Sequence, residues 1–452
     1  MASESYVRKN ISIAWPMALN ALLMQSMLMI DTFLVSPLGE ISLAAMGIAT
    51  TIIAFILGIQ MALAQGSQLV LSRAAGSGSQ VSLAKGFWSG AMINFSVASL
   101  FWLLLTLFES PLIALLTDHQ ALHAEISDYL AIGKHIVLVN AITQVMIALF
   151  NGLGRTTVPF KGYLLEMPVN AISSYFMIYG FGQWQGMGVE GAALGSLIAI
   201  GLRLAYLALC MRIDDAVHVP LSALDASMKS NSWAHFKEIF PVAANMTILS
   251  VGATIYQLIY SQLDINSYVA ITLIFPWVRA GTQFITAWAM SSAISISQAI
   301  GSKNLDDLDK NIDASINVAV GLSFISCLFF LGLSFVMDDF YPDLDPATYE
   351  ALAIIAPLYI LLPLVRGYNT VHGHVMRSLG KTTEVFKINF TGQWLVSIPL
   401  CALAILYFEL SVFWAFAFMP FEELVKLLPF RHLARKAVRE FDDDKAKQLM
   451  YD

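Results

Sequence analysis

The chain has 452 residues, of which 57% are hydrophobic and only 13% are charged, and its mean hydropathy is +0.68. A soluble globular protein carries about 25% charged residues. The composition therefore excludes a water-soluble enzyme, a disordered chain and a nucleic-acid-binding protein. The net charge of −7 also offers no basic surface to hold phosphates, so we expect most of the surface to face lipid.

Twelve stretches of the sequence are long enough to cross a membrane as helices, since about 20 apolar residues span the hydrocarbon core. The first six lie near residues 10–37, 44–71, 86–108, 127–152, 158–181 and 187–211. The second six lie near residues 235–262, 268–299, 312–336, 350–378, 386–407 and 410–430. The pattern predicts an all-α integral membrane protein with twelve transmembrane helices.

The basic residues predict how the chain is oriented. If the N-terminus is cytoplasmic, 20 of the 25 Lys and Arg residues fall on the cytoplasmic side, and the outer loops hold acids such as Glu109, Asp118, Asp338 and Asp343. Basic residues concentrate on the cytoplasmic side of membrane proteins, so we expect both termini there. The other five basic residues lie within spans: Lys134, Arg203, Arg279, Arg366 and Lys426. We expect Lys134 and Lys426 to extend toward the headgroups.

The sequence repeats itself across its midpoint. Residues 153–157 (LGRTT) recur as residues 379–383 (LGKTT), and residues 72–77 (SRAAGS) match residues 297–302 (SQAIGS), at offsets of 226 and 225. Pro16 and Asn20 match Pro241 and Asn245 at the same spacing. We therefore predict an N-terminal six-helix bundle over 1–211, a cytoplasmic linker over 212–234, a C-terminal six-helix bundle over 235–430 and a cytoplasmic tail over 431–452.

Two repeats with an even number of spans each run parallel, related by a pseudo-two-fold axis along the membrane normal. Secondary transporters have this architecture, with the substrate cavity between the halves near mid-membrane. A transport function is therefore favoured over a channel or a membrane enzyme.

Several motifs, in their order along the chain, resemble the multidrug and toxic compound extrusion (MATE) family. They are Trp15-Pro16, Ile30-Asp31-Thr32, residues 72–76 (SRAAG), residues 151–156 (NGLGRT) and residues 188–193 (GVEGAA). The resemblance covers nearly the whole chain. It implies two six-helix bundles and export of substrates driven by inward flow of protons or sodium ions.

Asp31 is the first candidate for coupling. A charge inside the hydrocarbon region costs roughly 2.5–3.5 kcal/mol on insertion scales, so such residues mark candidate functional sites. Asp31 lies about two-thirds of the way along the first span, on the family's acidic position, and we expect it to carry protons across the membrane. The alternative is a structural carboxylate bonded to neighbouring helices.

Further polar side chains lie on two spans of the first half. Glu166, Asn170 and Ser174 follow one another at helical spacing on the fifth span, so they share one face. Asn140, Thr143 and Gln144 form a similar face on the fourth span, and together with Asp31 they predict an oxygen-lined pocket, with Gln144 placed in the substrate cavity. Many related transporters have an aspartate where this chain has Ser174. Hard cations favour charged ligands, so the serine favours protons over sodium, although Glu166 could act in place of the missing acid or have a structural role.

The second half lacks acids where the norfloxacin-exporter branch carries them: the matching stretches are residues 245–249 (NMTIL) and 365–369 (VRGYN). We find no carboxylate-based cation site in the seventh and tenth spans, and this favours the DNA-damage-inducible F-like (DinF) branch, coupled through the N-terminal half. Arg366 lies near mid-membrane with Asn369 on its face, and Arg279 lies in the eighth span. A guanidinium suits carboxylates and phosphates, so these residues predict a cavity for an anionic or zwitterionic group. Equally open is an Arg366 paired with Asp31, Glu166 or backbone carbonyls.

The sequence as a whole predicts a secondary active antiporter that exports drugs or other organic compounds in exchange for protons, by protonation of Asp31. Two alternatives stay open: a sodium-coupled exporter, and a flippase or exporter of anionic or lipid-linked substrates that uses Arg366 and Arg279. No motif of an enzyme or a metal site is visible, and we expect no cofactor besides the coupling ion. We expect a monomer of the bacterial inner membrane that contacts lipid and organic substrates but no nucleic acid.

Overall fold

The structure is a computed structural model that describes residues 2–117, 119–214, 217, 219–220, 223 and 228–449. Three sequence predictions fall wholly or partly outside the described residues. They are the outer acid Asp118, much of the linker 212–234 and the last three residues of the tail.

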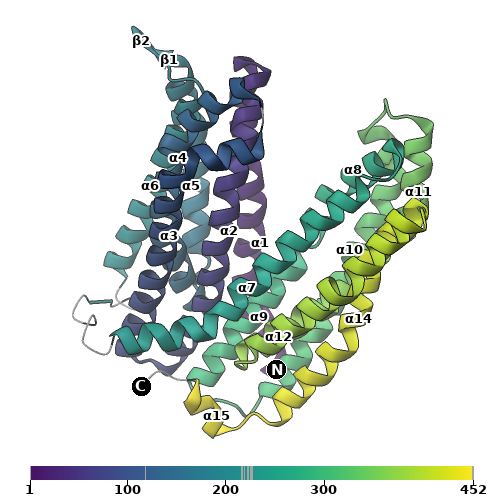
Figure 1. Ribbon diagram of the computed structural model, residues 1–452. Coiled ribbons are helices and arrows are strands. Elements are labelled where there is room, and N and C mark those ends of the chain that lie inside the picture. Colours follow the sequence, from purple (N-terminus) through teal and green to yellow (C-terminus); the bar gives the residue numbers. More distant parts are fainter. Residues whose placement is uncertain are drawn as a thin grey trace. The chain divides into compact units, whose positions relative to one another are not determined.

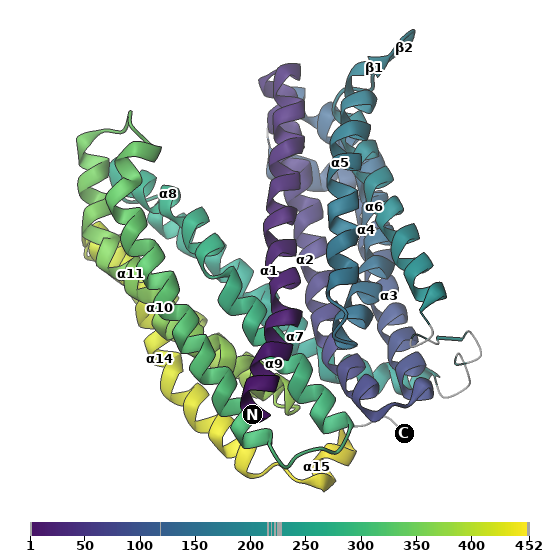
Figure 2. The same ribbon diagram turned by 180° about the vertical axis from the view of Figure 1, so that it is seen from behind.

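The first half of the chain forms six long helices. They are α1 (Ala2–Val35), α2 (Glu40–Ser77), α3 (Gln80–Leu116), α4 (Gln120–Gly152), α5 (Thr157–Tyr179) and α6 (Val189–Ile213). The short helix η1 (Ser36–Leu38) joins α1 to α2, and the strands β1 (Gly180–Phe181) and β2 (Trp184–Gln185) pair as a small hairpin between α5 and α6. Figures 1 and 2 show α4, α5 and α6 running side by side.

The second half repeats this plan with two interrupted helices. Its elements are α7 (Met228–Tyr260), α8 (Ile265–Gly281), α9 (Gln283–Gly301), α10 (Leu308–Phe340), α11 (Pro346–Ser378), α12 (Thr382–Phe390), η3 (Thr391–Ser397), α13 (Ile398–Ala402), η4 (Leu403–Tyr407), α14 (Val412–Arg439) and α15 (Asp443–Gln448). α8 and α9 form one span broken at Thr282, and the segments from α12 to η4 form another, with π-helical turns in η3 and η4.

The prediction of twelve helical spans is confirmed. In the described part of the chain, ten helices are long and apolar enough to cross a membrane. The other two predicted spans form α5 and α14, which are less apolar because they carry Glu166 in the first case and Glu422, Glu423 and Lys426 in the second. The same residues that lower the hydropathy of these two helices form the buried ion pairs described below.

The internal repeat reproduces one helix-ending geometry. α4 and α11 both end in a glycine with a φ of 77°, Gly154 and Gly380. The amide of the next residue donates to a carbonyl five residues back, from Arg155 to Phe150 at 2.8 Å and from Lys381 to Met376 at 2.9 Å. This is the Schellman ending, in which glycine adopts a left-handed conformation without strain. The repeated LG[RK]TT motif is thus a repeated helix stop.

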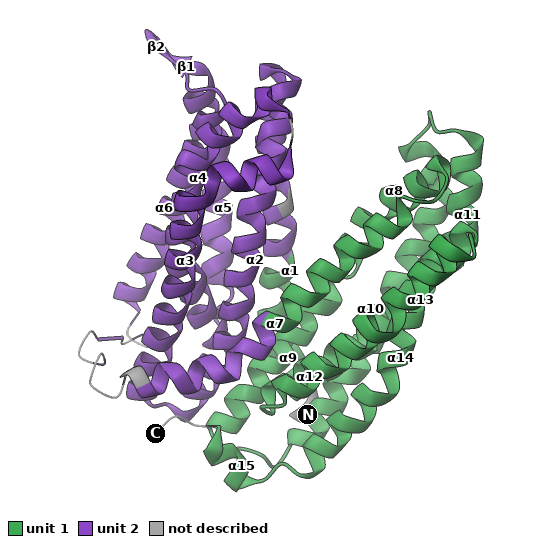
Figure 3. Ribbon diagram, viewed as in Figure 1, with its two compact units in different colours: residues 1–18, 244–450 green, residues 19–243, 451–452 purple. Residues whose placement is uncertain are grey.

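Contacts divide the chain into two compact units, coloured in Figure 3. We call residues 19–243 the N-terminal unit and residues 1–18 with 244–450 the C-terminal unit. α1 and α7 are therefore each shared between the units, with the changeover two residues after Pro16 and Pro241. The predicted bundles 1–211 and 235–430 instead end and begin at the linker, and those boundaries stay predictions.

The first part of α1 packs within the C-terminal unit through polar contacts. The Tyr6 hydroxyl lies 2.8 Å from Ser315 Oγ, Ser295 Oγ donates to Asn10 Oδ1 at 2.7 Å, and Lys9 Nζ donates to Gln298 Oε1 at 2.9 Å. The first two of these bonds are buried, where an unpaired polar group would be costly.

The first part of α7 packs within the N-terminal unit in the same way. His235 Nε2 lies 2.9 Å from Ser67 Oγ, and Glu238 forms an ion pair with the buried Arg73. A Cβ on Gly66 would lie 2.7 Å from Cβ of Ile239, so only glycine allows this close approach. His235 lies 225 residues after Asn10. The first parts of α1 and α7 therefore use equivalent positions of the internal repeat for these contacts.

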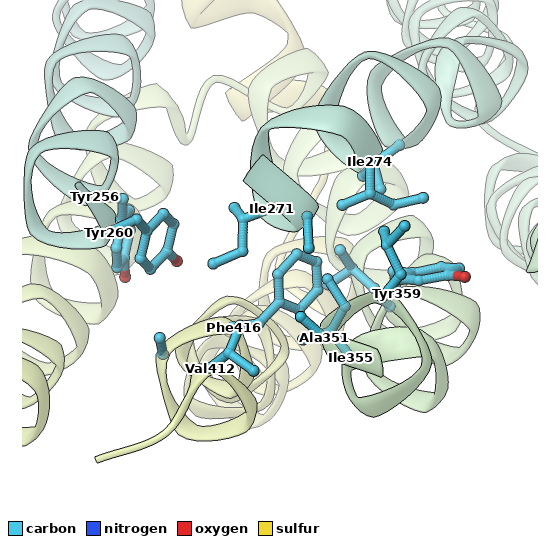
Figure 4. Packing of buried hydrophobic residues seen from close by; sticks show 14 of the residues in the cluster. Tyr256, Tyr260, Ile271, Ile274, Ala351, Ile355, Tyr359, Val412 and Phe416 are labelled. Atoms are coloured by element: carbon cyan, nitrogen blue, oxygen red, sulfur yellow. The ribbon is translucent and has the colours of Figure 1, made fainter. Parts of the chain in front are cut away.

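Each unit has its own apolar core. In the C-terminal unit, Figure 4 shows side chains of α7, α8, α11 and α14 meeting around Phe416, among them Tyr260, Ile271 and Ile355. In the N-terminal unit, α2, α4 and α6 contribute Ala49, Ile53, Ile126, Leu130 and Ala193. The coupling and substrate candidates are held on the helices that build these two cores.

Lys303 offers a test of the repeated helix endings. It occupies the position that Gly78 has in the first repeat, with a φ of 57° against 69°. The left-handed conformation costs an L-residue roughly 1–2 kcal/mol, and glycine loses about 0.5–1 kcal/mol more chain entropy on folding. We expect Lys303→Gly to raise the free energy of unfolding by about 0.5–1 kcal/mol, measured by denaturant unfolding in detergent. The reciprocal change Gly78→Lys serves as the matched control and is expected to destabilise the protein, whereas a gain in stability there would contradict the assignment.

Candidate functional site

Asp31 forms the centre of a polar cluster in the N-terminal unit. Asn170 Nδ2 of α5 donates to Asp31 Oδ1 at 2.8 Å, and Ser196 Oγ of α6 donates to Asp31 Oδ2 at 3.3 Å. The Asp31 side chain on α1 is half-buried. Three helices thus meet at one carboxylate, and both of its hydrogen bonds come from neutral groups.

Close packing of α5 and α6 brings Ser196 to Asp31. Gly191 and Gly195 of α6 are four residues apart, the spacing that lets two helices approach closely in membranes. A Cβ on Gly195 would lie 2.5 Å from Cα of Ser174, and Ser173 Oγ donates to the Gly195 carbonyl at 3.0 Å. The glycines therefore set the distance at which the hydroxyl of the next residue, Ser196, reaches the carboxylate.

Two oxygens beside this carboxylate have unused hydrogen-bonding capacity. Within the described residues, Asn170 Oδ1 and Ser174 Oγ are buried and have no hydrogen-bond partner. An unsatisfied buried polar atom costs about 1–3 kcal/mol, and these two atoms can accept a further hydrogen bond or ligate a cation. The predicted grouping of Asp31 with Asn170 and Ser174 is consistent with this geometry, while the coupling role itself stays a prediction.

Glu166 is neutralised by a different helix. Arg203 Nη1 of α6 lies 2.6 Å from Glu166 Oε2, both side chains are buried, and the guanidinium lies 4.2 Å from the ring centre of Tyr163. The sequence places both charges inside spans but does not predict that they pair. The pair gives Glu166 a cation partner of its own, which Asp31 lacks among the described residues.

Asn140 and Gln144 belong to a neutral network on α4. Asn140 Nδ2 donates to Gln60 Oε1 at 2.8 Å, Gln144 Nε2 donates to Asn140 Oδ1 at 3.3 Å, and Gln60 Nε2 donates to the Val137 carbonyl at 2.8 Å. Gln60 of α2 is completely buried and was missed by sequence reasoning, although its amide lies in an apolar run and could have been noticed there. In the described structure this network makes no hydrogen bond to Asp31.

The C-terminal unit contains a second charged cluster, on α11 and α14. Arg366 Nε lies 3.5 Å from Glu423 Oε1, and Asn369 Nδ2 donates to Glu423 Oε2 at 2.8 Å. The neighbouring Glu422 pairs with Lys426 and accepts a hydrogen bond from the Tyr256 hydroxyl at 2.8 Å. Both glutamates are buried.

One sequence expectation is wrong here. Lys426 does not extend to the headgroups, because its side chain is 3% exposed and Glu422 neutralises it. The acid beside Arg366 is Glu423, which the sequence does not predict as its partner. The acids of the C-terminal unit lie in the twelfth span, as Glu422 and Glu423, and not in the seventh or tenth, where the family resemblance directs attention. The signal was two acids and a lysine inside an otherwise apolar run, residues 412–430.

Arg279 lies at the last turn of α8, just before the break at Thr282, and its side chain is exposed. No ion pair of Arg279 is seen within the described residues. It is thus the second arginine of the C-terminal unit that is placed within a span and accessible.

A sequence model of the MatE family matches residues 16–176 and again residues 241–403. These two stretches cover most of the chain and coincide with its two repeats. The chain belongs to the MatE family. Members of this family are multi-pass membrane transporters of small organic compounds rather than enzymes.

Individual relatives of this MatE transporter are distant in sequence and similar in fold. "Probable multidrug resistance protein NorM" of Rhizobium meliloti is 22% identical over 402 residues, which cover 86% of this chain and 82% of that protein. The crystal structure of the Vibrio cholerae MATE transporter VcmN in the bent form has a TM-score of 0.86 at 18% identity and covers 99% of both chains. That of the eukaryotic MATE transporter AtDTX14 has a TM-score of 0.85 at 15% identity and covers 100% of this chain and 99% of that one. The shared fold is two bundles of six transmembrane helices.

The Glu166–Arg203 pair of the transporter can be tested by a double-mutant cycle. Removing one partner of a buried ion pair costs about 3–5 kcal/mol, because the other charge is left uncompensated. We expect Glu166→Gln and Arg203→Met each to lower the free energy of unfolding by up to about that amount. The double variant should lose less than the sum of the two single losses. Additive losses in unfolding measured in detergent would contradict the pairing.

The glycine contact between α5 and α6 predicts that alanine destabilises the protein at one position of α6 but not at another. Gly195→Ala places a Cβ against the backbone of Ser174, so we expect a lower unfolding temperature and a separation of Ser196 from Asp31. Gly201→Ala is the matched control, because nothing lies within 4 Å of its Cβ position. It should leave the unfolding temperature unchanged or raise it slightly, since alanine is the better helix former. Equal effects of the two substitutions would refute the close approach.

Proposed function

We propose that this MatE transporter exports organic compounds in exchange for inward protons, coupled through Asp31. The observation that carries the proposal is the hydrogen bonding of that carboxylate by neutral donors, Asn170 and Ser196. An arginine partner would hold a carboxylate in its charged form, whereas amide and hydroxyl groups can bond either form. The amide oxygen of Asn170 can accept the proton of a neutral carboxyl group.

The charge arrangement of the N-terminal unit supports the same choice of residue. Glu166 is paired with Arg203, so a proton taken up there would break a buried ion pair. Asp31 has no such partner within the described residues. Of the two acids predicted inside this unit, Asp31 is therefore the one whose charge can change at smaller cost.

Sodium remains the alternative coupling ion. Asp31, Asn170 and Ser174 offer a carboxylate, an amide oxygen and a hydroxyl oxygen, and hard cations favour such ligands. One carboxylate and two neutral oxygens are few for a sodium site, and the serine at position 174 removes a second charge. We therefore favour protons, and with them the DinF-like branch.

The substrates we propose are drugs and other organic compounds, in keeping with the name of the Rhizobium meliloti relative. We further propose that the protein acts as a monomer in the inner membrane of a bacterium, with both termini in the cytoplasm, as the distribution of its basic residues indicates. No cofactor other than the coupling ion is part of the proposal.

Efflux in proteoliposomes tests the coupling assignment. We expect an imposed pH gradient, but not an equal sodium gradient, to drive export of a fluorescent cationic dye by the wild type. Asp31→Asn should reduce this export at least about tenfold, since it removes the carboxyl group whose protonation couples dye export to proton entry. Dye exchange without a gradient should continue in the variant.

Asp264→Asn is the matched control for this experiment. It makes the same chemical change at the start of α8, outside the membrane-spanning segments, where Asp264 accepts a hydrogen bond from the Ser267 amide at 3.0 Å. Asparagine caps helices as well as aspartate does, so export should be unchanged. Unchanged export by Asp31→Asn under a pH gradient would overturn the proposal, and export driven by sodium alone would replace the proton with the alternative ion.

A further inference from the structure

We propose that Arg366 receives an anionic group of a transported or lipid molecule, a carboxylate or a phosphate, and that Glu423 is the internal counter-ion which this group displaces. The inference deepens the proposed export function by naming a substrate class and a residue that selects for it. It concerns the C-terminal unit alone and does not involve Asp31.

Arg366 is the accessible cation of its cluster. Its side chain is 29% exposed, whereas that of Lys426 is 3% exposed. Arg366 lies well inside α11, 20 residues after Pro346 and 12 before Ser378. A charged side chain at such depth faces the protein or a water-filled cavity rather than lipid tails. The exposed part of the guanidinium is therefore open to a ligand that arrives through water.

The contact between Arg366 and Glu423 is loose. The distance of 3.5 Å from Nε to Oε1 is beyond the usual range for an N–H···O hydrogen bond, which ends near about 3.2 Å. A guanidinium has five N–H donors in a planar fork, and this fork matches a carboxylate or phosphate in a bidentate way. Most of the donor capacity of Arg366 is thus available to a second anion.

Glu423 keeps other partners if Arg366 turns to a ligand. Asn369 Nδ2 donates to its side chain at 2.8 Å, and Lys426 Nζ lies 3.8 Å from its other oxygen. Glu422 does not compete for Arg366, because Lys426 and the Tyr256 hydroxyl already bind it. The exchange of one anion for another at Arg366 therefore leaves no buried carboxylate without a partner.

A buried hydroxyl close to the cluster is unpartnered. Tyr260 of α7 is completely buried, its hydroxyl has no hydrogen-bond partner within the described residues, and its ring centre lies 5.9 Å from that of Tyr256. Figure 4 shows Tyr260 beside Tyr256, whose hydroxyl bonds Glu422. Tyr260 can supply a neutral donor to a second oxygen of the bound group.

The internal repeat shows that the fold does not require this charge. The residue equivalent to Arg366 in the first repeat is Asn140, which forms a neutral network with Gln60 and Gln144. The accessible Arg279 adds a second positive charge to the same unit. The charges of the C-terminal unit are thus an addition to a scaffold that packs without them.

Binding of a matched pair of dyes to the purified, full-length protein in detergent tests the proposal. Rhodamine B carries a carboxylate, and in its ethyl ester a neutral ester with a small ethyl group replaces that negative charge. Hydrogen bonds to a charged group predict that the wild type prefers rhodamine B by about tenfold or more, measured by fluorescence anisotropy. Arg366→Gln should abolish the preference, and Arg366→Lys should retain part of it.

Glu423→Gln provides the second, independent variant. It removes the competing anion, so we expect it to bind rhodamine B more tightly than the wild type and to leave binding of the ester unchanged. Thermal unfolding of each variant shows whether it is folded. The proposal is overturned if Arg366→Gln weakens both dyes equally, or if Glu423→Gln weakens rhodamine B in a folded protein.

Added phosphatidylglycerol distinguishes the two sources of the anionic group. If this lipid displaces rhodamine B from the wild type but phosphatidylcholine does not, a lipid phosphate occupies the site. If neither lipid displaces the dye, the group that occupies the site is the carboxylate of a soluble compound. Both outcomes require that the wild type binds rhodamine B more tightly than the ester. If it does not, the proposed anion site at Arg366 is refuted. Because no ion gradient is applied, Asp31→Asn should keep the preference, so a failure here is distinct from a failure of proton coupling.

Discussion

The charged and amide contacts inside both units reflect the cost of leaving a polar group unpaired in hydrocarbon. Arg203 neutralises Glu166, and Lys426 neutralises Glu422, each on a neighbouring helix or turn of the same unit. Even neutral amides such as those of Asn140 and Gln60 are joined to one another. Against this background, two of the described ionisable groups that lack a close counter-ion are informative. They are Asp31, which has only neutral donors, and Arg366, whose nearest carboxylate is 3.5 Å away.

The two units have similar backbones, but the polar side chains inside them differ. Their repeated helix endings at Gly154 and Gly380 have the same φ and the same hydrogen bonds. The N-terminal unit places a lone carboxylate among neutral donors, whereas the C-terminal unit places two acids and two cations together. A fold built by repetition can therefore assign coupling to one half and recognition of a charged substrate to the other, because the side chains in the core of each half vary independently.

Sequence patterns predicted the helices well, because membrane thickness imposes a length and an apolar composition that can be counted. They also identified the ionisable residues inside the spans, since each is conspicuous in an apolar run. They did not predict the partners. Glu166 and Arg203 are 37 residues apart and Arg366 and Glu423 are 57 apart, so their pairing depends on which helices are neighbours. Lys426 was misassigned for the same reason, because a lysine near a span end looks the same whether it reaches water or a buried glutamate.

By itself, the sequence determined the twelve spans, their repeat, the family motifs and the short set of charges that the membrane makes costly. These properties are local, or repeat at a fixed offset, and so can be recognised without coordinates. Only the tertiary structure decided that Asn170 and Ser196 bond Asp31, that Arg203 removes Glu166 as a free acid, and that Glu423 lies beside Arg366. It also decided that α1 and α7 are each shared between the two units. The physical reason is that neighbouring helices are fixed by close approaches, such as those of Gly195 to Ser174 and Gly66 to Ile239. Each of these depends on the shape of a single contact. A single contact produces no periodic pattern in the sequence.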